Sequence, residues 1–107
     1  MSAATSGRAR EHAVAKEMAA DGWVQIMRAA GSKGPADLAM AHEDHGLALV
    51  QVGTDNKSLG PADRFRLLHA ADLCSALPVL ASKAARKPIT YRLVSYGPAS
   101  TWEAWKP

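Results

Sequence analysis

The sequence is poor in cysteine and has no long apolar run, and both shortages restrict the kind of protein it encodes. Cys74 is the one cysteine among the 107 residues, so no internal disulfide can form. This excludes a disulfide-stapled secreted scaffold and fits a reducing cytoplasm. The longest uninterrupted apolar runs, at residues 47–50 and 77–81, are far shorter than the roughly 20 residues that span a bilayer. With no targeting segment evident, we expect a cytoplasmic protein with no membrane partner.

Neither sign of charge is scarce, but the basic residues are unevenly distributed. Thirteen Lys and Arg against ten Asp and Glu give a net charge of +3, which permits nucleic-acid binding without indicating it. Residues 54–107 contain eight basic and four acidic side chains, whereas residues 1–53 contain five and six. Because 48% of the 107 residues are apolar, the chain suffices for one compact domain, spanning residues 1–107, and is too short for two.

Local sequence patterns predict two helices and five strands. The first helix is expected over residues 8–20, before an Asp-Gly stop, and the second begins at Pro61 and includes Cys74 in its buried face. The strands are expected at residues 23–29, 38–41, 47–54, 78–82 and 89–95. The tail, residues 102–105, contains two tryptophans that could cap the sheet or a partner. This order of elements predicts an α/β domain with a mixed sheet flanked by helices.

Three polar residues stand out against these apolar elements. Glu11 precedes Val14 and Met18 on the apolar stripe of the first helix, so its carboxylate should face inward. Asp37 starts a strand directly after a glycine-rich loop, and Gln51 interrupts an apolar strand. Carboxylate and amide oxygens are the ligands that Mg²⁺ prefers. The three residues together suggest a metal pocket that can activate water and stabilise charge on a phosphodiester.

Each of these residues also has a plain structural interpretation. Glu11 can be a half-buried acid paired with Arg8 or Arg28, Asp37 can cap a turn, and Gln51 can be a hydrogen-bonded polar residue within a strand. The two interpretations predict the same inward-facing side chains, so the residue types alone leave both open.

Other polar combinations indicate no chemistry. His42 and His45 lie in an expected hairpin turn without the further ligands of a zinc site. Residues 31–34 lack the spacing of a P-loop, and Ser32 has no neighbouring histidine at a spacing that predicts contact.

Four segments are similar to a known nuclease superfamily. They are Gly7 with Glu11, Arg28-Ala-Ala-Gly-Ser-Lys-Gly before Asp37, Leu47-Ala-Leu-Val-Gln-Val, and Pro78-Val-Leu-Ala-Ser-Lys. In this layout the chain, over residues 7–95, resembles the PD-(D/E)XK nucleases and, within them, the small archaeal-type and phage Holliday junction resolvases. The resemblance implies a restriction-endonuclease-like fold in the cytoplasm of a bacterial, archaeal or phage-infected cell. It also implies a homodimer that nicks four-way DNA junctions symmetrically with Mg²⁺, for which Mn²⁺ can substitute.

The resemblance also implies roles for individual positions. Glu11, Asp37 and Gln51 would be the metal ligands, Ser32 a loop residue beside the scissile phosphate, and residue 53 the catalytic lysine. Here the family's Glu-X-Lys or Gln-X-Lys motif is Gln51-Val52-Gly53, so the amine is missing. Positioned electrostatic groups of this kind contribute about 10²–10³ in rate.

The missing lysine leaves two functional hypotheses. Lys57, in the turn after the strand, and Lys33, in the glycine loop, are candidate replacements, and the chain is then a Mg²⁺-dependent, structure-selective DNA endonuclease. Alternatively, it is a catalytically degenerate protein that binds branched DNA without cutting it. Both functions predict salt-sensitive phosphate contacts by basic side chains. The expected DNA contacts are Arg8, Arg10, Lys33, Arg64, Lys83, Arg86 and Lys87.

Overall fold

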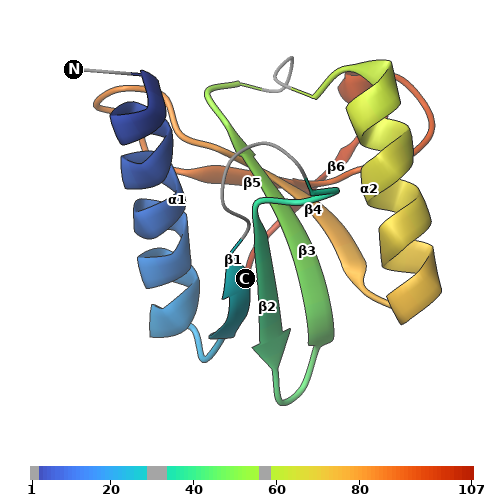
Figure 1. Cartoon of the computed structure of the whole chain (residues 1–107), viewed down its shortest axis with the longest axis horizontal. Helices are drawn as coiled ribbons and strands as arrows, with labels where there is room; N and C mark the ends of the chain where they lie inside the picture. The colour runs from blue at the N-terminus through green and yellow to red at the C-terminus, as the bar shows by residue number, and fades with distance from the viewer. Residues whose placement is uncertain (1–2, 29–33, 56–58) are drawn as a thin grey trace.

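A computed structural model describes residues 3–28, 34–55 and 59–107, which fold into two helices, six strands and one short 3-10 turn (Figure 1). The elements are α1 (Ala3–Ala20), β1 (Val24–Arg28), β2 (Leu38–His42), β3 (Gly46–Gly53), α2 (Pro61–Cys74), β4 (Leu77–Ser82), β5 (Thr90–Leu93), η1 (Ala99–Thr101) and β6 (Glu103–Trp105). Every helix and strand expected from the sequence is present, with boundaries shifted by a few residues.

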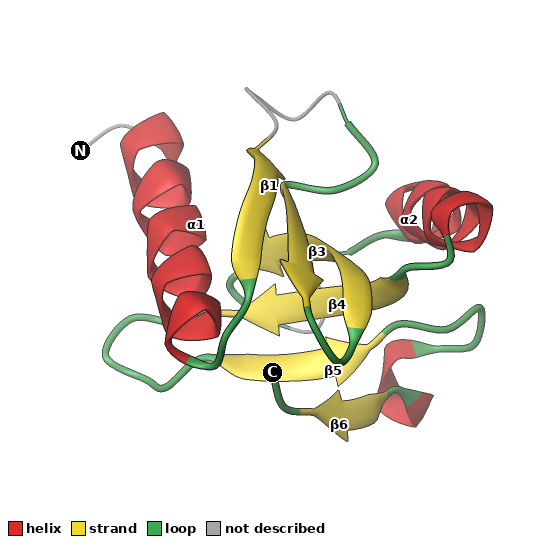
Figure 2. Cartoon of the chain, turned by 90° about the horizontal axis from the view of Figure 1, so that it is seen from below, coloured by secondary structure: helices red, strands yellow, loops and turns green. Residues whose placement is uncertain are grey.

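The six strands form one sheet in the order β1-β2-β3-β4-β5-β6. β3 and β4 pair in parallel because α2 connects them as a crossover, whereas the other neighbouring strands are antiparallel. α1 covers one face of the sheet and α2 covers the other, as Figures 1 and 2 show. The predicted α/β architecture, a mixed sheet flanked by helices, is therefore confirmed.

An apolar core lies on each face of the sheet, and β3 contributes to both. On the α1 face, Val14 and Met18 are fully buried in the cluster that contains Val50. On the α2 face, Leu67 is buried in the cluster against which Leu49 packs. Since successive strand residues point to opposite faces, a strand covered on both sides must be apolar at every position. The covering helices therefore account for the continuous apolar run in β3.

The C-terminal tail changes the predicted order of elements. Residues 103–105 form β6, which pairs antiparallel with β5 and extends the sheet to six strands. Trp102, just before it, is 3% exposed, and its Nε1–H donates to the Gly97 carbonyl oxygen at 3.0 Å. Trp105 packs edge-on against Trp23, with ring centroids 5.6 Å apart. Of the two predicted roles for the tail, the structure supports packing against the sheet.

Two local predictions were wrong. α1 begins at Ala3, well before the expected residue 8. Cys74 is exposed, whereas we expected it in the buried face of α2. The buried residues of α2 are Leu67, Leu68 and Ala71, so the buried stripe ends before the last helical turn. Helical periodicity predicts which face is apolar, but the sheet covers that face over part of its length only.

β3 extends past the end of its neighbour β2, and this difference in length positions the candidate site. The last β1–β2 pair joins Arg28 to Leu38, and Leu38 pairs with Val50 on β3. Beyond this level, residues 51–53 pair with β4 on one side and, within the described part of the chain, with no strand on the other. We call residues 51–53 the open edge of β3. It lies beside Asp37, the residue that precedes β2.

The packing of the tail predicts that Trp102 is essential for stability. Trp102→Ala removes a large buried side chain, so the free energy of unfolding should fall by about 3–5 kcal/mol. Glu103→Ala, at an exposed position of β6, is the matched control and should change it by about 0.5 kcal/mol or less. Urea unfolding measures both. Equal effects of the two substitutions would show that the tail does not belong to the folded core.

Candidate active site

Asp37 is fixed to the open edge of β3 by two hydrogen bonds. Its N–H donates to the Val50 carbonyl oxygen at 3.0 Å, and its Oδ2 accepts from the Val52 N–H at 2.8 Å. The carboxylate thus satisfies a main-chain donor that has no partner strand beyond the end of β2. Because both contacts flank Gln51, Asp37 lies directly beside the position where the sequence predicts a metal ligand.

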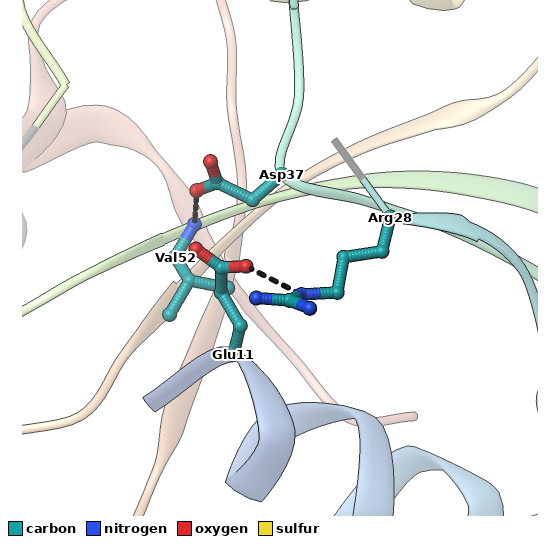
Figure 3. A network of polar contacts seen from close by, with 4 residues as sticks. All are labelled: Glu11, Arg28, Asp37 and Val52. Atoms are coloured by element: carbon teal, nitrogen blue, oxygen red, sulfur yellow. Dashed lines mark hydrogen bonds and ion pairs between the residues drawn. The ribbon is translucent and has the colours of Figure 1, made fainter. Parts of the chain in front are cut away.

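Glu11 reaches the same place from α1. Val14 and Met18, one and two turns further along the helix, are buried in the core and hold α1 against the sheet. The Glu11 side chain is 18% exposed, and its Oε1 accepts from Arg28 Nε–H at 3.1 Å. Arg28 is the last residue of β1, so α1, β1 and β3 all contribute to one polar network, which Figure 3 shows together with Asp37.

The two carboxylates influence each other electrostatically. Burial is the main cause that raises the pKa of Asp37 above its usual range, and the negative charge of Glu11 raises it further. The hydrogen bond from Val52 opposes both effects because it favours the ionised form. Two acids that are held near one another in this way form a site that a cation would stabilise.

An open cleft of about 430 Å³ lies beside this network, between α1 and β1. Its charged and polar lining consists of Arg8, Glu11, His12, Gln25 and Arg28, with Ala9, Ala15 and Leu38 completing the wall. The cleft thus combines one carboxylate with two guanidinium groups. Guanidinium groups are suited to phosphate because their donors match two phosphate oxygens at once.

The strand register places Gln51 and Gly53 on the same face of β3. Gln51 pairs with Leu80 and Gly53 pairs with Ser82, and Leu80 belongs to the core on the α2 side. Glu11, by contrast, comes from the helix on the opposite face. The open edge is where groups from both faces can meet, since β2 ends there. Gly53 itself is buried, so a longer side chain at this position would have to extend past its neighbours.

Three residues with predicted catalytic or DNA-binding roles, Ser32, Lys33 and Lys57, lie outside the described residues. The other expected DNA contacts fall into two groups. Arg10 and Lys83 line a second hollow, of about 370 Å³, on the side of α1 away from the cleft. Arg86 and Lys87 are exposed in the turn that follows β4.

Arg64 is separate from these groups. It is half-buried on α2, donates through Nη1 to the Gly97 carbonyl oxygen at 3.2 Å and lies over the Trp102 ring, 5.1 Å from its centroid. Contacts of this kind stabilise the fold. Lys83 also has an internal role, since its Nζ donates to the carbonyl oxygens of Ala84 and Lys87.

The donor set is compatible with a hard divalent cation. Among the described residues, no group of three or more His, Cys, Asp and Glu gathers that could hold a metal ion. Mg²⁺ is nevertheless commonly held by one or two carboxylates together with waters and substrate phosphates. Glu11 and Asp37 offer carboxylate oxygens of that kind at the open edge, whereas Gln51 lies on the α2 face of β3. They would hold the ion only with help from water or phosphate.

The sequence analysis did not assign a functional role to Arg28. It identified Arg28 as one of two possible partners of Glu11, and the structure selects it over Arg8. Arg28 ends β1 directly before the glycine-rich part of the sequence, and a basic residue at that position is the sequence signal for its place in the cleft. His12, next to Glu11 on α1, was also missed and lines the cleft.

Comparison with solved structures shows that this fold is shared with a Holliday junction resolvase, as the resemblance in the sequence implied. One matching structure is Hjc, a Holliday junction resolvase from the archaeal hyperthermophile Archaeoglobus fulgidus. The TM-score is 0.68 and the sequence identity 19%, and the match covers 80% of this chain and 70% of that one. At this identity the match defines the fold.

Two other comparisons found no relatives. No protein-family model matches the chain, and no curated protein matches it. No helix in the described ranges is long and apolar enough to cross a bilayer.

The raised pKa of Asp37 predicts that this residue lowers stability at neutral pH. Because the folded pKa lies above the unfolded value, the folded protein binds more protons between the two values, and stability falls as the pH rises through that interval. Asp37→Asn keeps an oxygen that accepts from Val52 and removes the charge, so its urea midpoint at pH 7 should exceed that of the original protein. The gain should disappear below the usual carboxyl pKa of about 4.

Asp44→Asn, at an exposed position of the β2–β3 turn, is the control for loss of one negative charge. It should leave the midpoint nearly unchanged at both pH values. A lower midpoint for Asp37→Asn at pH 7 would contradict the assignment of electrostatic strain to this site.

Proposed function

We propose that this protein is a divalent-metal-dependent endonuclease that acts on branched DNA, of the junction resolvase kind. The observation that carries the proposal is the placement of Glu11 and Asp37 at the open edge of β3, in a fold shared with a resolvase. Folding places two carboxylates where they repel each other, and a divalent cation between them would relieve that repulsion. Mg²⁺ is the proposed ion, with Mn²⁺ as a substitute.

In this proposal each residue of the network has a defined task. Asp37 and Glu11 hold the ion with the Gln51 amide, and the Val52 N–H fixes Asp37 in place. The bound ion would activate water and stabilise charge on the phosphodiester. Arg28 orients Glu11 before substrate binds.

The basic residues suggest how DNA would lie on the protein. The first half of α1 and the turn after β4 lie next to each other, and both surround the second hollow (Figure 1). Arg8 in the cleft, Arg10 and Lys83 in the hollow, and Arg86 and Lys87 in the turn place positive charge on both sides of α1. A phosphate backbone crossing this end of the molecule would pass the two carboxylates. We assign Arg64 to the fold rather than to DNA because of its contacts with Trp102 and Gly97.

A binding protein without catalysis is the second candidate, and Gly53 favours it. Glycine supplies no amine at the position where the related motif has lysine, and the candidate replacements Lys33 and Lys57 fall outside the described residues. The clustered carboxylates favour the enzyme, because without a cation they would repel a DNA phosphate. A cytoplasmic location beside replicating or recombining DNA would suit either function.

Restoring the lysine is the experiment that separates the two functions. Gly53→Lys should raise the rate of cleavage of a synthetic four-way junction in Mg²⁺ or Mn²⁺ by about 10² or more. The backbone of Gly53 is not in the left-handed region, so its conformation does not require glycine. Thermal unfolding checks that the variant folds, and a gel assay measures cleavage. Adding Asp37→Asn to Gly53→Lys should abolish the cleavage and any heat of Mn²⁺ binding.

Lys57→Ala in the original background completes this test. If it abolishes a rate that Gly53→Lys does not improve, residue 57 supplies the missing amine. If neither original nor restored protein cuts the junction, the endonuclease proposal fails and DNA binding alone remains.

The outer side of α2 suggests the surface through which two copies would assemble. Phe65, His69 and Leu73 recur every four residues, and Phe65 and Leu73 are 60% and 76% exposed. Tyr96 packs edge-on against Phe65 and is 61% exposed. The buried stripe of α2 is on the other side, so the helix is apolar on two sides. We propose that a second copy covers this outer stripe, because a two-fold dimer would supply two sites for symmetric nicks.

Light scattering at micromolar concentration should therefore give about twice the 11.3 kDa of one chain. Leu73→Glu should produce the monomer, because it would bury a charge within the apolar stripe. Val24→Glu, on the exposed edge strand β1, is the matched control and should leave the dimer intact. A monomeric original protein, or a dimer that only Val24→Glu disrupts, would exclude the α2 interface.

A further inference from the structure

Arg28 holds an oxygen that the proposed metal ion would need. Its Nε–H donates to Glu11 Oε1 at 3.1 Å, and Figure 3 shows the Glu11 and Arg28 side chains extending toward each other next to Asp37. A guanidinium and a divalent cation compete for the same carboxylate oxygen, because each is attracted by its negative charge. The Glu11 side chain is 18% exposed, so most of its surface is already covered by the protein.

The Arg28 guanidinium can also dissociate from Glu11. Its side chain is 41% exposed and lines the open cleft, and its contact with Glu11 is a single hydrogen bond rather than a two-pronged pair. Ion pairs with an exposed partner contribute little to stability, so another anion in the cleft can displace this one. A DNA phosphate is an anion that a guanidinium binds through two donors at once.

The formal charges of the site favour binding of the metal ion and the DNA phosphate together. Glu11 and Asp37, both ionised, and Arg28 together carry a net charge of −1. Adding a divalent ion alone gives +1, and adding a phosphodiester alone gives −2. With both ligands present, the charges of these three residues and the two ligands sum to zero, and Arg8 in the same cleft adds one positive charge that faces the phosphate. Charge left uncompensated in a partly buried site is unfavourable, so each ligand should improve the binding of the other.

We propose that Arg28 is an exchangeable counter-ion that couples metal binding to DNA binding: it occupies Glu11 in the free protein and transfers to a DNA phosphate when the metal binds. This inference rests on the proposed function and adds to it a regulation of the same site. In the free protein, Arg28 keeps metal affinity low. On branched DNA, the phosphate withdraws Arg28 and the complete metal site forms.

The test begins with metal binding in the absence of DNA. Calorimetry with Mn²⁺ on Arg28→Ala should give an affinity about two- to fivefold tighter than that of the original protein at low ionic strength. Arg28→Lys keeps the charge and should remain close to the original. Arg8→Ala removes a guanidinium that lines the same cleft, and it should tighten Mn²⁺ binding less than Arg28→Ala. Thermal unfolding confirms that each variant is folded.

The second measurement is the affinity for a fluorescent four-way junction with and without Ca²⁺, which takes oxygen ligands with looser geometry than Mg²⁺. A gel checks that the junction stays intact. Ca²⁺ should tighten binding to the original protein by about tenfold, within the usual range of coupling between two sites, and by much less in Arg28→Ala. In Arg8→Ala the junction should bind more weakly with and without Ca²⁺, while the coupling remains.

The outcomes separate the inference from the proposed function. Unchanged or weaker Mn²⁺ binding by Arg28→Ala would mean that Arg28 only positions Glu11, and the exchange would be overturned. Equal coupling in Arg28→Ala and the original protein would overturn it as well. If the original protein binds no junction under any condition, the proposed function fails, whereas tighter Mn²⁺ binding by Arg28→Ala would still support competition at Glu11.

Discussion

The hydrogen bond from the Val52 N–H to Asp37 Oδ2 is the contact on which the candidate site depends. β2 is shorter than β3, and a main-chain donor at the end of the shared ladder needs an acceptor. The Asp37 carboxylate provides it at 2.8 Å and is thereby held at the edge of the sheet rather than in solvent. The difference in strand length thus creates both the space for a site and the contact that fixes its first acid.

The remaining parts of the site follow from how this edge is covered. α1 lies over the face that contains Val50, and its buried residues bring Glu11 close enough to raise the pKa of Asp37. Arg28, at the end of β1, compensates part of the negative charge. Repulsion between acids opposes folding, so this arrangement is one that packing elsewhere must stabilise. Both apolar cores and the β6 tail supply that packing.

The sequence predicted the helices and the main strands well, because apolar residues repeat at a different spacing in helices and in strands. The glycine-rich loop and the polar turn at residues 42–46 mark where strands stop, and Pro61 marks where α2 begins. β6 was not predicted because three residues are too few for an alternating pattern, and Trp102 before it and Trp105 at its end suit many kinds of contact. Cys74 was misplaced because periodicity does not reveal how far a sheet extends beneath a helix.

The site residues were predictable in a similar, limited way. Glu11 and Asp37 were identified as candidate metal ligands because acids next to apolar stripes and strand starts are unusual in a sequence. The partner of Glu11 was left open between Arg8 and Arg28, since an ion pair between α1 and β1 depends on how the two elements pack. Strand alternation predicted that Gln51 and Gly53 share one face of β3. It did not predict on which side of the sheet α1 lies, which depends on how the whole sheet is assembled.

One acid lies on a helix and the other at the edge of the sheet, and this affects the fraction of molecules that have both acids in place at a given time. Asp37 is held by β3, whereas Glu11 is held only through the docking of α1 by residues such as Val14 and Met18. A helix that docks on a sheet through one face can open locally at a lower free energy than the central strands. Transient detachment of α1 would separate the acids while the sheet stays folded. The fraction of complete sites would then be set by the local docking equilibrium of one helix and not by the global stability of the domain.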